Sequence, residues 1–427
     1  MNIAYLDPPY SRYFHRLAAR LAKRTEGNVV ALLSSPAYRI YTRGDRALVW
    51  QPGRAEQAPP LPPGTAHATW SQPVDEEFLH VFWHAVAWFR ERFRQERIGL
   101  CFLFSDARPF SLAAALAARE LDISCIYFER GAYRYCTASI STLGLNARFD
   151  LRRAQQLDGV QGLPPDEQLH RRPLERGLKR HFVRFILSNA VALMRHPERR
   201  RLQHKRYAIG PYLRLSLVQW WSEHHLGRSD DARLRLEDGA PLVLIPMQLP
   251  GDSQMVLHSP FESNQAFIDF VVAQARSSNP ATRVLVKRHP MDSTRYRMPE
   301  GANLVGGNLG RFFARDPVVV CVNSTVGFEA AARGVQVVCF GESFYTDPEY
   351  VAHAAPASFG DHLVEAMRRG RDTEAGHALR AAVLRWYQAP GDAWAFTKLD
   401  LDRTAEIILQ HHLAGRRMDA AGGAVER

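Results

Sequence analysis

The sequence predicts an α/β protein with two mainly parallel sheets that face each other across a cleft. Three observations support this fold class. Short apolar runs alternate with helix-period segments in two separate regions, which is the pattern of β-α-β units. The chain of 427 residues is too long for one compact core. The region between the two alternating regions is basic and shows no strand-like alternation.

The first alternating region contains four predicted strands. They are NIAYL (2–6), NVVALL (28–33), IGLCFLF (98–104) and ISCIYFE (123–129). Helix-period segments follow the first and third of them, as YFHRLAARLAKR and SLAAALAAREL. We therefore expect residues 1–150 to form an N-terminal Rossmann-like domain.

The second alternating region repeats the pattern. Its predicted strands are PLVLIPM (241–247), RVLVKR (283–288), VVVCVN (318–323) and VQVVCFG (335–341). The predicted helices are FIDFVVAQARS and FEAAARG, and Gly334 ends the second one as a C-cap residue. We expect residues 236–412 to form a C-terminal Rossmann-like domain, residues 151–235 a mainly helical connection, and residues 413–427 a flexible tail.

Composition favours a cytoplasmic protein with an anionic partner. No apolar stretch is long enough to cross a membrane, and the first residues do not resemble a signal peptide. Four of the five cysteines lie in or beside apolar runs without a CxxC pair, which favours buried thiols over disulfides or zinc. The net charge of +11 indicates nucleic acid, an anionic membrane surface or a phosphorylated substrate.

The positive charge is concentrated between Arg171 and Arg206. One face of a helix in this segment is predicted to carry Leu178, Phe182, Phe185, Ile186 and Leu193, flanked by Lys179, Arg180 and Arg184. This pattern is typical of a helix that lies on anionic lipid, and the alternative is a core helix with a solvated cationic face. Nucleic acid is not expected as a partner, because no helix-turn-helix, zinc finger or RNP-type motif is present.

Five predicted strands end in polar residues, where a doubly wound sheet binds its ligand. These ends are Ser105 to Pro109, Glu129 to Gly131, Gln248 to Ser253, Lys287 to Pro290, and Asn323 to Thr325. Each also has an ordinary interpretation. Cations after a strand can be solvated, Ser324 can cap a helix, Gly251-Asp252 can form a turn, and Glu129 can pair with Arg108, Arg130 or Arg134.

Several common site motifs are absent. The sequence lacks GxxxxGK[ST], GxGxxG after the first strand, HExxH and GxSxG, which disfavours P-loop NTPases, dehydrogenases, zinc proteases and α/β-hydrolases. No DxD-like pair stands at a strand end, so a metal-bound diphosphate donor has little support.

The order of the motifs is more specific than any one of them. The series SDARP, FERG, TLGLN, PMQLPGDSQM, VKRHP, VNSTVGFEAAARG and FGESFY, between residues 105 and 345, resembles the bacterial capsule polysaccharide synthesis family. The resemblance is strongest to KpsS-like β-Kdo glycosyltransferases, which start the Kdo linker on a phospholipid. It implies a GT-B-like pair of Rossmann-type domains and a CMP-Kdo donor. A CMP-sugar has one phosphate, so no metal or other cofactor is expected.

The resemblance also implies roles for single residues. Donor-binding residues would be Gln248, Asp252, Ser253, Lys287, His289, Asn323, Ser324, Thr325, Gly327 and Glu329. Catalytic residues would be Glu129, Asp106 and His289, with Arg108 and Arg134 on the acceptor side. The implied partners are a phosphatidylglycerol-type or Kdo-lipid acceptor, the inner face of the cytoplasmic membrane and other capsule assembly proteins.

The sequence departs from the family pattern beside Glu129. The family has a second acid, a proline and a later glutamate where this chain has Arg130, Tyr135 and Ser141. If the second acid is the family's nucleophile, this chain lacks it, and either Glu129 replaces it or the activity is altered or lost. Two alternatives therefore remain open: a GT-B transferase with a different activated sugar or glycerol donor, and a non-catalytic capsule assembly or export factor.

Overall fold

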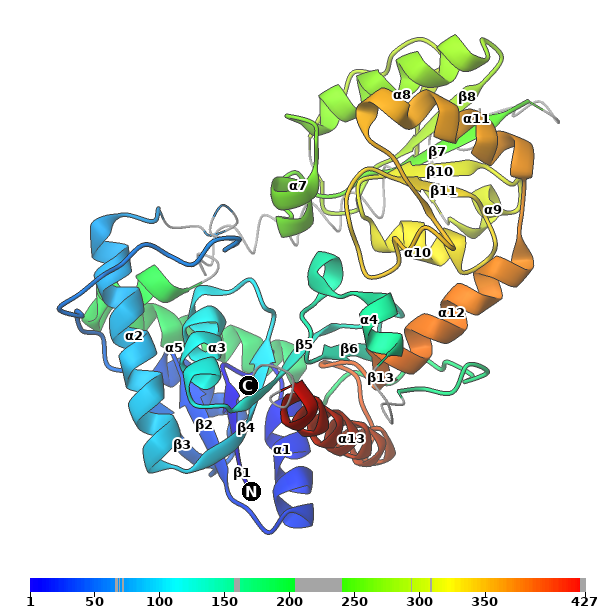
Figure 1. Cartoon of the computed structure of the whole chain (residues 1–427). Helices are drawn as coiled ribbons and strands as arrows, with labels where there is room; N and C mark the ends of the chain where they lie inside the picture. The colour runs from blue at the N-terminus through cyan, green and yellow to red at the C-terminus, as the bar shows by residue number, and fades with distance from the viewer. Residues whose placement is uncertain are drawn as a thin grey trace. The chain divides into compact units, whose positions relative to one another are not determined.

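The computed structural model describes residues 1–65, 68, 70, 73–156, 162–203, 240–292, 294–307 and 309–422, the last twelve as backbone only. The chain divides into two compact units. Unit 1 contains residues 1–208 and 384–427, and unit 2 contains residues 209–383. Each has its own sheet, so the prediction of two α/β domains is confirmed (Figure 1). The cleft between the sheets stays a prediction.

The sheet of unit 1 has seven strands in the order β13-β6-β5-β4-β1-β2-β3. Their bounds are β1 Asn2–Leu6, β2 Val29–Leu33, β3 Arg46–Val49, β4 Ile98–Phe104, β5 Ser124–Arg130, β6 Thr137–Ser141 and β13 Gln388–Pro390. The strands from β5 to β3 pair in parallel, while β6 and β13 add an antiparallel edge. The central strands are apolar throughout because helices cover both faces of the sheet.

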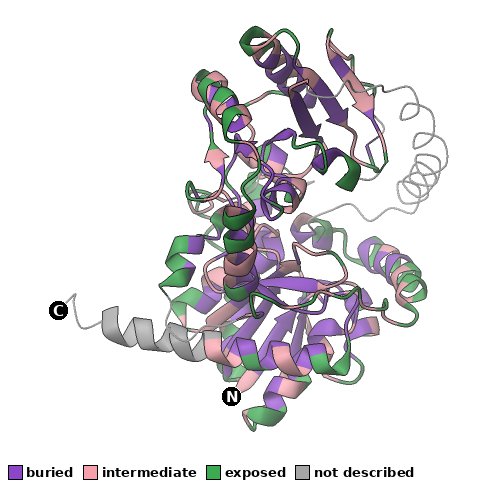
Figure 2. Cartoon of the chain, turned by 90° about the vertical axis from the view of Figure 1, so that its right-hand side faces the viewer, coloured by how far each residue is buried: buried purple, intermediate pink, exposed green. Residues whose placement is uncertain are grey.

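The longer helices of unit 1 are α1 (Tyr13–Arg24), α2 (Glu76–Gln95), α3 (Pro109–Glu120), α5 (Leu178–Arg195) and α13 (Lys398–Gly422). Shorter ones are η1 (Pro36–Tyr41), η3 (Asn146–Arg148), α4 (Leu151–Gln155) and η4 (Pro197–Leu202). Helices α2 and α3 pack together over one face of the sheet, and α1 and α13 pack together over the other. Figure 2 shows the strands buried between these layers.

Unit 2 has a six-stranded, fully parallel sheet in the order β12-β11-β10-β7-β8-β9. The bounds are β7 Leu242–Pro246, β8 Arg283–Lys287, β9 Ala302–Val305, β10 Val318–Cys321, β11 Val337–Cys339 and β12 Ala352–His353. The helices are α7 Ser253–His258, α8 Asn264–Ser278, α9 Gly310–Phe313, α10 Thr325–Ala331, η6 Pro356–Ser358, α11 Phe359–Arg369 and α12 Thr373–Tyr387. Helices α8 and α11 share one buried apolar cluster with the sheet.

Every strand predicted from the sequence is present, with ends that differ by a few residues. Strands β3, β6, β9, β12 and β13 were not predicted. Four of these, β3, β9, β12 and β13, lie at sheet edges, and β12 and β13 have three residues or fewer, so their apolar pattern is too brief to identify them. The five cysteines are free thiols, of which Cys101, Cys321 and Cys339 are buried.

The predicted domain boundaries differ from the structure at both ends of the second domain. Residues 151–203 belong to unit 1, where a separate connection was expected. Residues 384–412 return to unit 1, where β13 pairs with β6 and α13 packs on α1. A strand at a sheet edge takes its partner from tertiary contacts, which local pattern does not reveal. Helix α13 continues to Gly422, into the predicted flexible tail, because Ala, Arg and Met there are good helix formers.

The basic segment contains the predicted helix, α5, but three of the five residues of the predicted apolar face are buried. Phe185, Ile186 and Leu193 are buried against unit 1, where α5 packs on η1 and η4. This corrects the expectation that these residues contact lipid. They match the alternative of a core helix, because packing against Tyr38 and its neighbours removes them from water.

Candidate functional site

Three of the predicted strand ends are neighbours on the sheet of unit 2. Strands β10, β7 and β8 are adjacent and parallel, so their carboxyl ends lie at one edge. The residues at or just beyond these ends are Asn323, Gln248 and Lys287. The sequence prediction that these polar groups gather at one sheet edge therefore agrees with the topology.

Gln248 and Asn323 are joined by two hydrogen bonds. The Gln248 amide donates to Asn323 Oδ1 at 3.1 Å, and the Asn323 backbone N–H donates to Gln248 Oε1 at 3.3 Å. The Asn323 amide also donates to Gln254 Oε1 at 3.2 Å. On the other side, the Asn264 amide donates to the Gln248 carbonyl at 2.9 Å. This network fixes amide groups from two strand ends and two helices.

The turn after β8 is held by its own side chains. The Met291 backbone N–H donates to His289 Nδ1 at 3.1 Å, so a neutral His289 ring carries its proton on Nε2. Asp292 is buried and accepts hydrogen bonds from the Tyr296 hydroxyl and the Thr294 backbone. Lys287 ends β8 and is partly buried. The turn thus contains the Lys287 ammonium, whose Nζ lies 3.5 Å from the Arg288 carbonyl oxygen, and the His289 imidazole.

The remaining predicted donor residues have structural roles. Ser324 caps α10 by accepting from the Val326 N–H, and Asp252 caps α7 by accepting from the Gln254 N–H. Thr325 and Ser253 are the first residues of these two helices. A side chain at Gly327 would lie 2.4 Å from the Tyr345 hydroxyl. Gly327 therefore makes room for a core tyrosine, and no ligand is needed to explain it.

Glu329 forms an ion pair with Arg333 at 2.9 Å, one turn further along the chain, and both side chains are substantially exposed. Such a pair is typical of a solvated helix surface. No observation tests whether Glu329 contacts a ribose, so this role stays a prediction.

Two acidic residues of unit 1 lie at the carboxyl ends of two adjacent strands. Glu129 lies on β5, and Asp106 lies two residues beyond the end of β4. Within the described part of the chain, Glu129 has no ion pair and accepts only the backbone N–H of Arg130, at 3.0 Å. The alternative that Glu129 serves a salt bridge with Arg108, Arg130 or Arg134 therefore finds no support.

Burial raises the pKa of Asp106, and the nearby charge of Glu129 raises it further. Arg148, whose Nη1 lies 3.9 Å from Asp106 Oδ2, and the Leu145 N–H at 3.1 Å oppose this shift. A carboxyl whose pKa lies above its ordinary value holds a proton more readily than a solvated carboxyl does, which suits it to a role in proton transfer.

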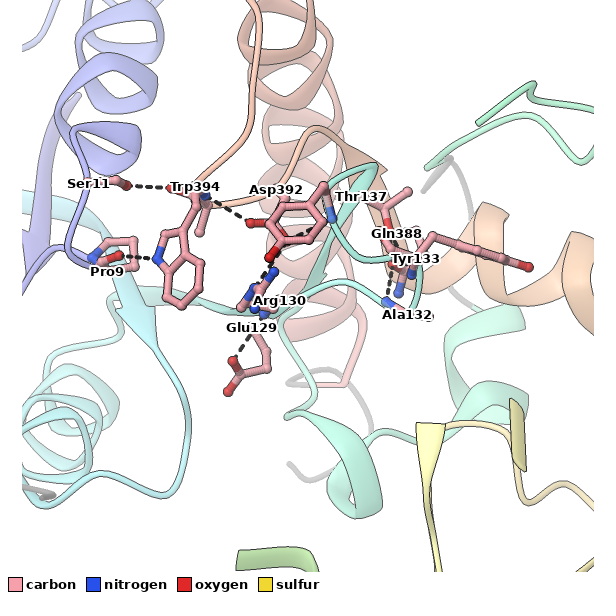
Figure 3. A network of polar contacts seen from close by, with 12 residues as sticks. Pro9, Ser11, Glu129, Arg130, Ala132, Tyr133, Thr137, Gln388, Asp392 and Trp394 are labelled. Atoms are coloured by element: carbon pink, nitrogen blue, oxygen red, sulfur yellow. Dashed lines mark hydrogen bonds and ion pairs between the residues drawn. The ribbon is translucent and has the colours of Figure 1, made fainter. Parts of the chain in front are cut away.

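Arg130 points to the opposite side of β5 from Glu129, as consecutive strand residues do. Its Nε lies 3.2 Å from Oδ2 of the fully buried Asp392. The guanidinium also lies over the rings of Trp394 and Tyr135, at 4.2 and 5.0 Å. Figure 3 shows Glu129 directed away from this network. The Arg130 side chain is therefore part of the packing beneath the β5–β6 turn.

The segment that contains β13 holds the β5–β6 turn in place. Gln388 Oε1 accepts from the Thr137 hydroxyl at 2.7 Å and from the Ala132 N–H at 3.1 Å, while its amide donates to Ser139. Asp392 accepts the Tyr135 N–H at 3.3 Å. These contacts join residues 249 to 257 positions apart in sequence, and they reach the turn and strand β6 that follow the strand carrying Glu129. The sequence offered no signal for them.

The two predicted acceptor-side arginines differ in their surroundings. Arg108 begins α3, and its guanidinium lies 4.8 Å from the centre of the Phe104 ring. Arg134 is exposed in the β5–β6 turn. Neither position tests the predicted role.

Asp7 was missed by the sequence analysis. It directly follows β1, and its carboxylate is partly buried and accepts from the Ser34 N–H at 2.8 Å and the Ser34 hydroxyl at 2.6 Å. Together with Arg108 it lines a pocket at the carboxyl ends of β1, β2 and β4. The polar residue after the apolar run NIAYL was the available signal.

The partly buried Asp7 predicts a pH dependence of stability. Burial raises its pKa from 3.8 to about 6, so the native state keeps a proton that the unfolded chain releases between these values. The contribution of protonated Asp7 to the free energy of unfolding is thus fully present below about pH 4 and is lost as the pH rises through about 6. We expect Asp7→Asn to raise the free energy of unfolding, relative to wild type, by up to about 3 kcal/mol at pH 7 and little at pH 4. Chemical denaturation at both pH values measures this, and a pH-independent difference would contradict it.

In the described ranges, no group of three or more His, Cys, Asp and Glu side chains is placed to hold a metal ion. No described helix is both long and apolar enough to cross a membrane.

Comparisons with known proteins place these features in context. A model of the family "capsule polysaccharide biosynthesis protein" matches residues 101–368. The capsule polysaccharide modification protein LipB of Neisseria meningitidis serogroup A is 25% identical over 335 residues, which are 72% of this chain and 77% of LipB. Protein FixF of Sinorhizobium fredii is 32% identical over 130 residues, 29% of this chain and 32% of FixF.

Among solved structures, KpsC of Thermosulfurimonas dismutans, a beta Kdo 2,7 transferase, matches 77% of this chain and 89% of its own, with 13% identity and a TM-score of 0.38. The UDP-GlcNAc 2-epimerase of Neisseria meningitidis matches 90% of this chain and 97% of its own, with 10% identity and a TM-score of 0.34. These similarities concern the fold class alone and carry no argument about function.

Proposed function

The chain belongs to the capsule polysaccharide biosynthesis protein family, and from this premise we propose that it is a KpsS-like glycosyltransferase that transfers Kdo from CMP-Kdo to a lipid acceptor. One observation supports the proposal most strongly. The carboxyl ends of β10, β7 and β8 lie at the same edge of the unit 2 sheet, and this edge carries Gln248, Asn323 and the Lys287–His289 turn. The choice of CMP-Kdo rests on the motif series of the sequence.

Unit 2 has the groups that a nucleotide monophosphate requires. Lys287 supplies a positive charge for the phosphate, and the Nε2–H of a neutral His289 donates a hydrogen bond to a phosphate or carboxylate oxygen. Gln248 and Asn323 supply amide groups for the base or the sugar. The single phosphate of CMP needs no metal to neutralise it, so we propose that the transfer is metal-independent.

The chemistry is assigned to the two carboxyl groups of unit 1. In the first step, a Glu129 oxygen attacks the anomeric carbon of Kdo, and the bond to the CMP phosphate breaks with its electron pair leaving on CMP. In the second step, the acceptor hydroxyl oxygen attacks the same carbon and the ester to Glu129 breaks. The hydroxyl proton passes to Asp106, whose raised pKa favours accepting it. Two displacements retain the anomeric configuration.

The absence of any partner cation for Glu129 supports this assignment. An ion pair would hold the carboxylate away from an incoming carbon and reduce its nucleophilicity, and none exists among the described residues. Arg130, which stands where the family has a second acid, is engaged with Asp392 on the other side of β5.

Thermal unfolding with CMP, UDP and CDP tests the donor class. We expect CMP to raise the melting temperature more than UDP or CDP, because a ligand that binds only the native state stabilises it. A Gln248→Ala/Lys287→Ala variant is expected to lose the shift. Preferential stabilisation by UDP would favour a different activated sugar, and no stabilisation by any of the three would favour a non-catalytic assembly factor.

A further inference from the structure

The outward face of α5 carries a stripe of exposed apolar side chains. Val183, Leu187, Val191 and Met194 are 57%, 52%, 44% and 72% exposed. Their spacing of four, four and three residues places them on one side of the helix. Single exposed apolar residues are common, but four in a row on one helix mark an interaction surface. This outer stripe is separate from the buried face that contains Phe185 and Leu193.

The charges around the outer stripe define its partner. Lys179, Arg180, Arg184 and Arg195 are exposed on the same side of α5, and none of them forms an ion pair within the described residues. The helix contains no acidic residue. Helical periodicity places Lys179 on one flank of the stripe and Arg184 and Arg195 on the other. A protein partner would need apolar side chains between two rows of acidic residues. An anionic bilayer offers apolar acyl chains and negatively charged head groups everywhere on its surface.

We propose that the outer stripe of α5 docks unit 1 on an anionic lipid surface. The four apolar side chains enter the boundary between head groups and acyl chains, and the flanking cations remain at the level of the lipid phosphates. The α5 backbone would lie parallel to the surface, because its opposite face is fixed to η1 and η4. This inference is independent of the sugar donor and of catalysis.

Co-sedimentation of the full chain with lipid vesicles tests the proposal. We expect binding to vesicles of phosphatidylcholine with phosphatidylglycerol, weaker binding to phosphatidylcholine alone, and a decrease with added salt. Leu187→Gln/Met194→Gln is expected to weaken partitioning at least about tenfold. Arg180→Gln/Arg184→Gln is expected to remove most of the preference for phosphatidylglycerol.

The matched control is Val364→Gln/Leu399→Gln, which removes two apolar side chains that are 52% and 67% exposed on α11 and α13. This control should bind vesicles as the wild type does. Equal loss in both double variants would overturn the proposal, as would undiminished binding of the α5 variant.

Sedimentation velocity without lipid completes the test, because a molar mass that falls in the α5 variant would mean that a second copy covers the stripe. Since no nucleotide sugar is present, failure here is distinguishable from failure of the proposed transfer.

Discussion

Glu129→Gln is expected to abolish sugar transfer, with a loss of at least about a hundredfold, while the protein remains folded and still binds CMP. The amide cannot form the ester with the anomeric carbon, but it is similar in size to the carboxylate. It can also still accept the Arg130 N–H through its oxygen. Product formation from CMP-Kdo measures the first effect, and the CMP-induced melting shift measures the second.

The control for this variant is Glu56→Gln, in an exposed loop of unit 1. It should transfer at the wild-type rate. If Glu129→Gln retained full activity, another carboxylate would be the nucleophile, and Asp106→Asn would be the next variant to measure. If the binding of CMP were lost together with the activity, a merely structural role for Glu129 would explain both.

Asp392→Ala is expected to destabilise unit 1 by about 3 kcal/mol or more. Asp392 is fully buried, and it accepts from Arg130, from the Tyr135 N–H and from the Trp394 N–H at 2.9 Å. Its removal leaves a guanidinium that is only 19% exposed without its counter-ion, and Arg130 Nη2 already lacks a hydrogen-bond partner. Chemical denaturation measures the loss as a lower midpoint of the unfolding transition.

The double variant Arg130→Met/Asp392→Leu separates charge from packing. Replacing both members of a buried ion pair by apolar residues is often close to neutral, so we expect this variant to recover most of the stability that Asp392→Ala loses. Additive losses from the two positions would show that Asp392 acts through its backbone contacts and that its pairing with Arg130 contributes little.

The strand ends could be predicted from sequence because parallel strands fix the position of whatever follows them. Gln248, Lys287 and Asn323 each follow an apolar run, and the carboxyl ends of neighbouring parallel strands meet at one edge. The contacts of Asp392 and Gln388 with the β5–β6 turn could not be predicted. They depend on a chain that leaves unit 1, forms unit 2 and returns, and the residues around Asp392 have the pattern of an ordinary turn.

Helix α5 shows a different limit. Its sequence contains two apolar stripes, one through Phe185 and Leu193 and one through Leu187 and Met194. Periodicity identifies both equally well. Only the packing of η1 and η4 against the first stripe decides which one is buried. Likewise, Gly327 was predicted to let a ligand approach the backbone. The Tyr345 hydroxyl already requires a glycine at this position, because it packs against Gly327 while it donates a hydrogen bond to the carbonyl of Ser324, 21 residues earlier in the sequence.

The most direct test of the central claim is mass spectrometry of a lysophosphatidylglycerol-type acceptor after incubation with the protein and CMP-Kdo, without added metal. The proposal predicts a lipid product heavier by one Kdo residue and an equal amount of released CMP, both absent with Glu129→Gln. An unchanged acceptor, with no CMP released by the wild-type protein, would contradict the assignment of this chain as a Kdo transferase.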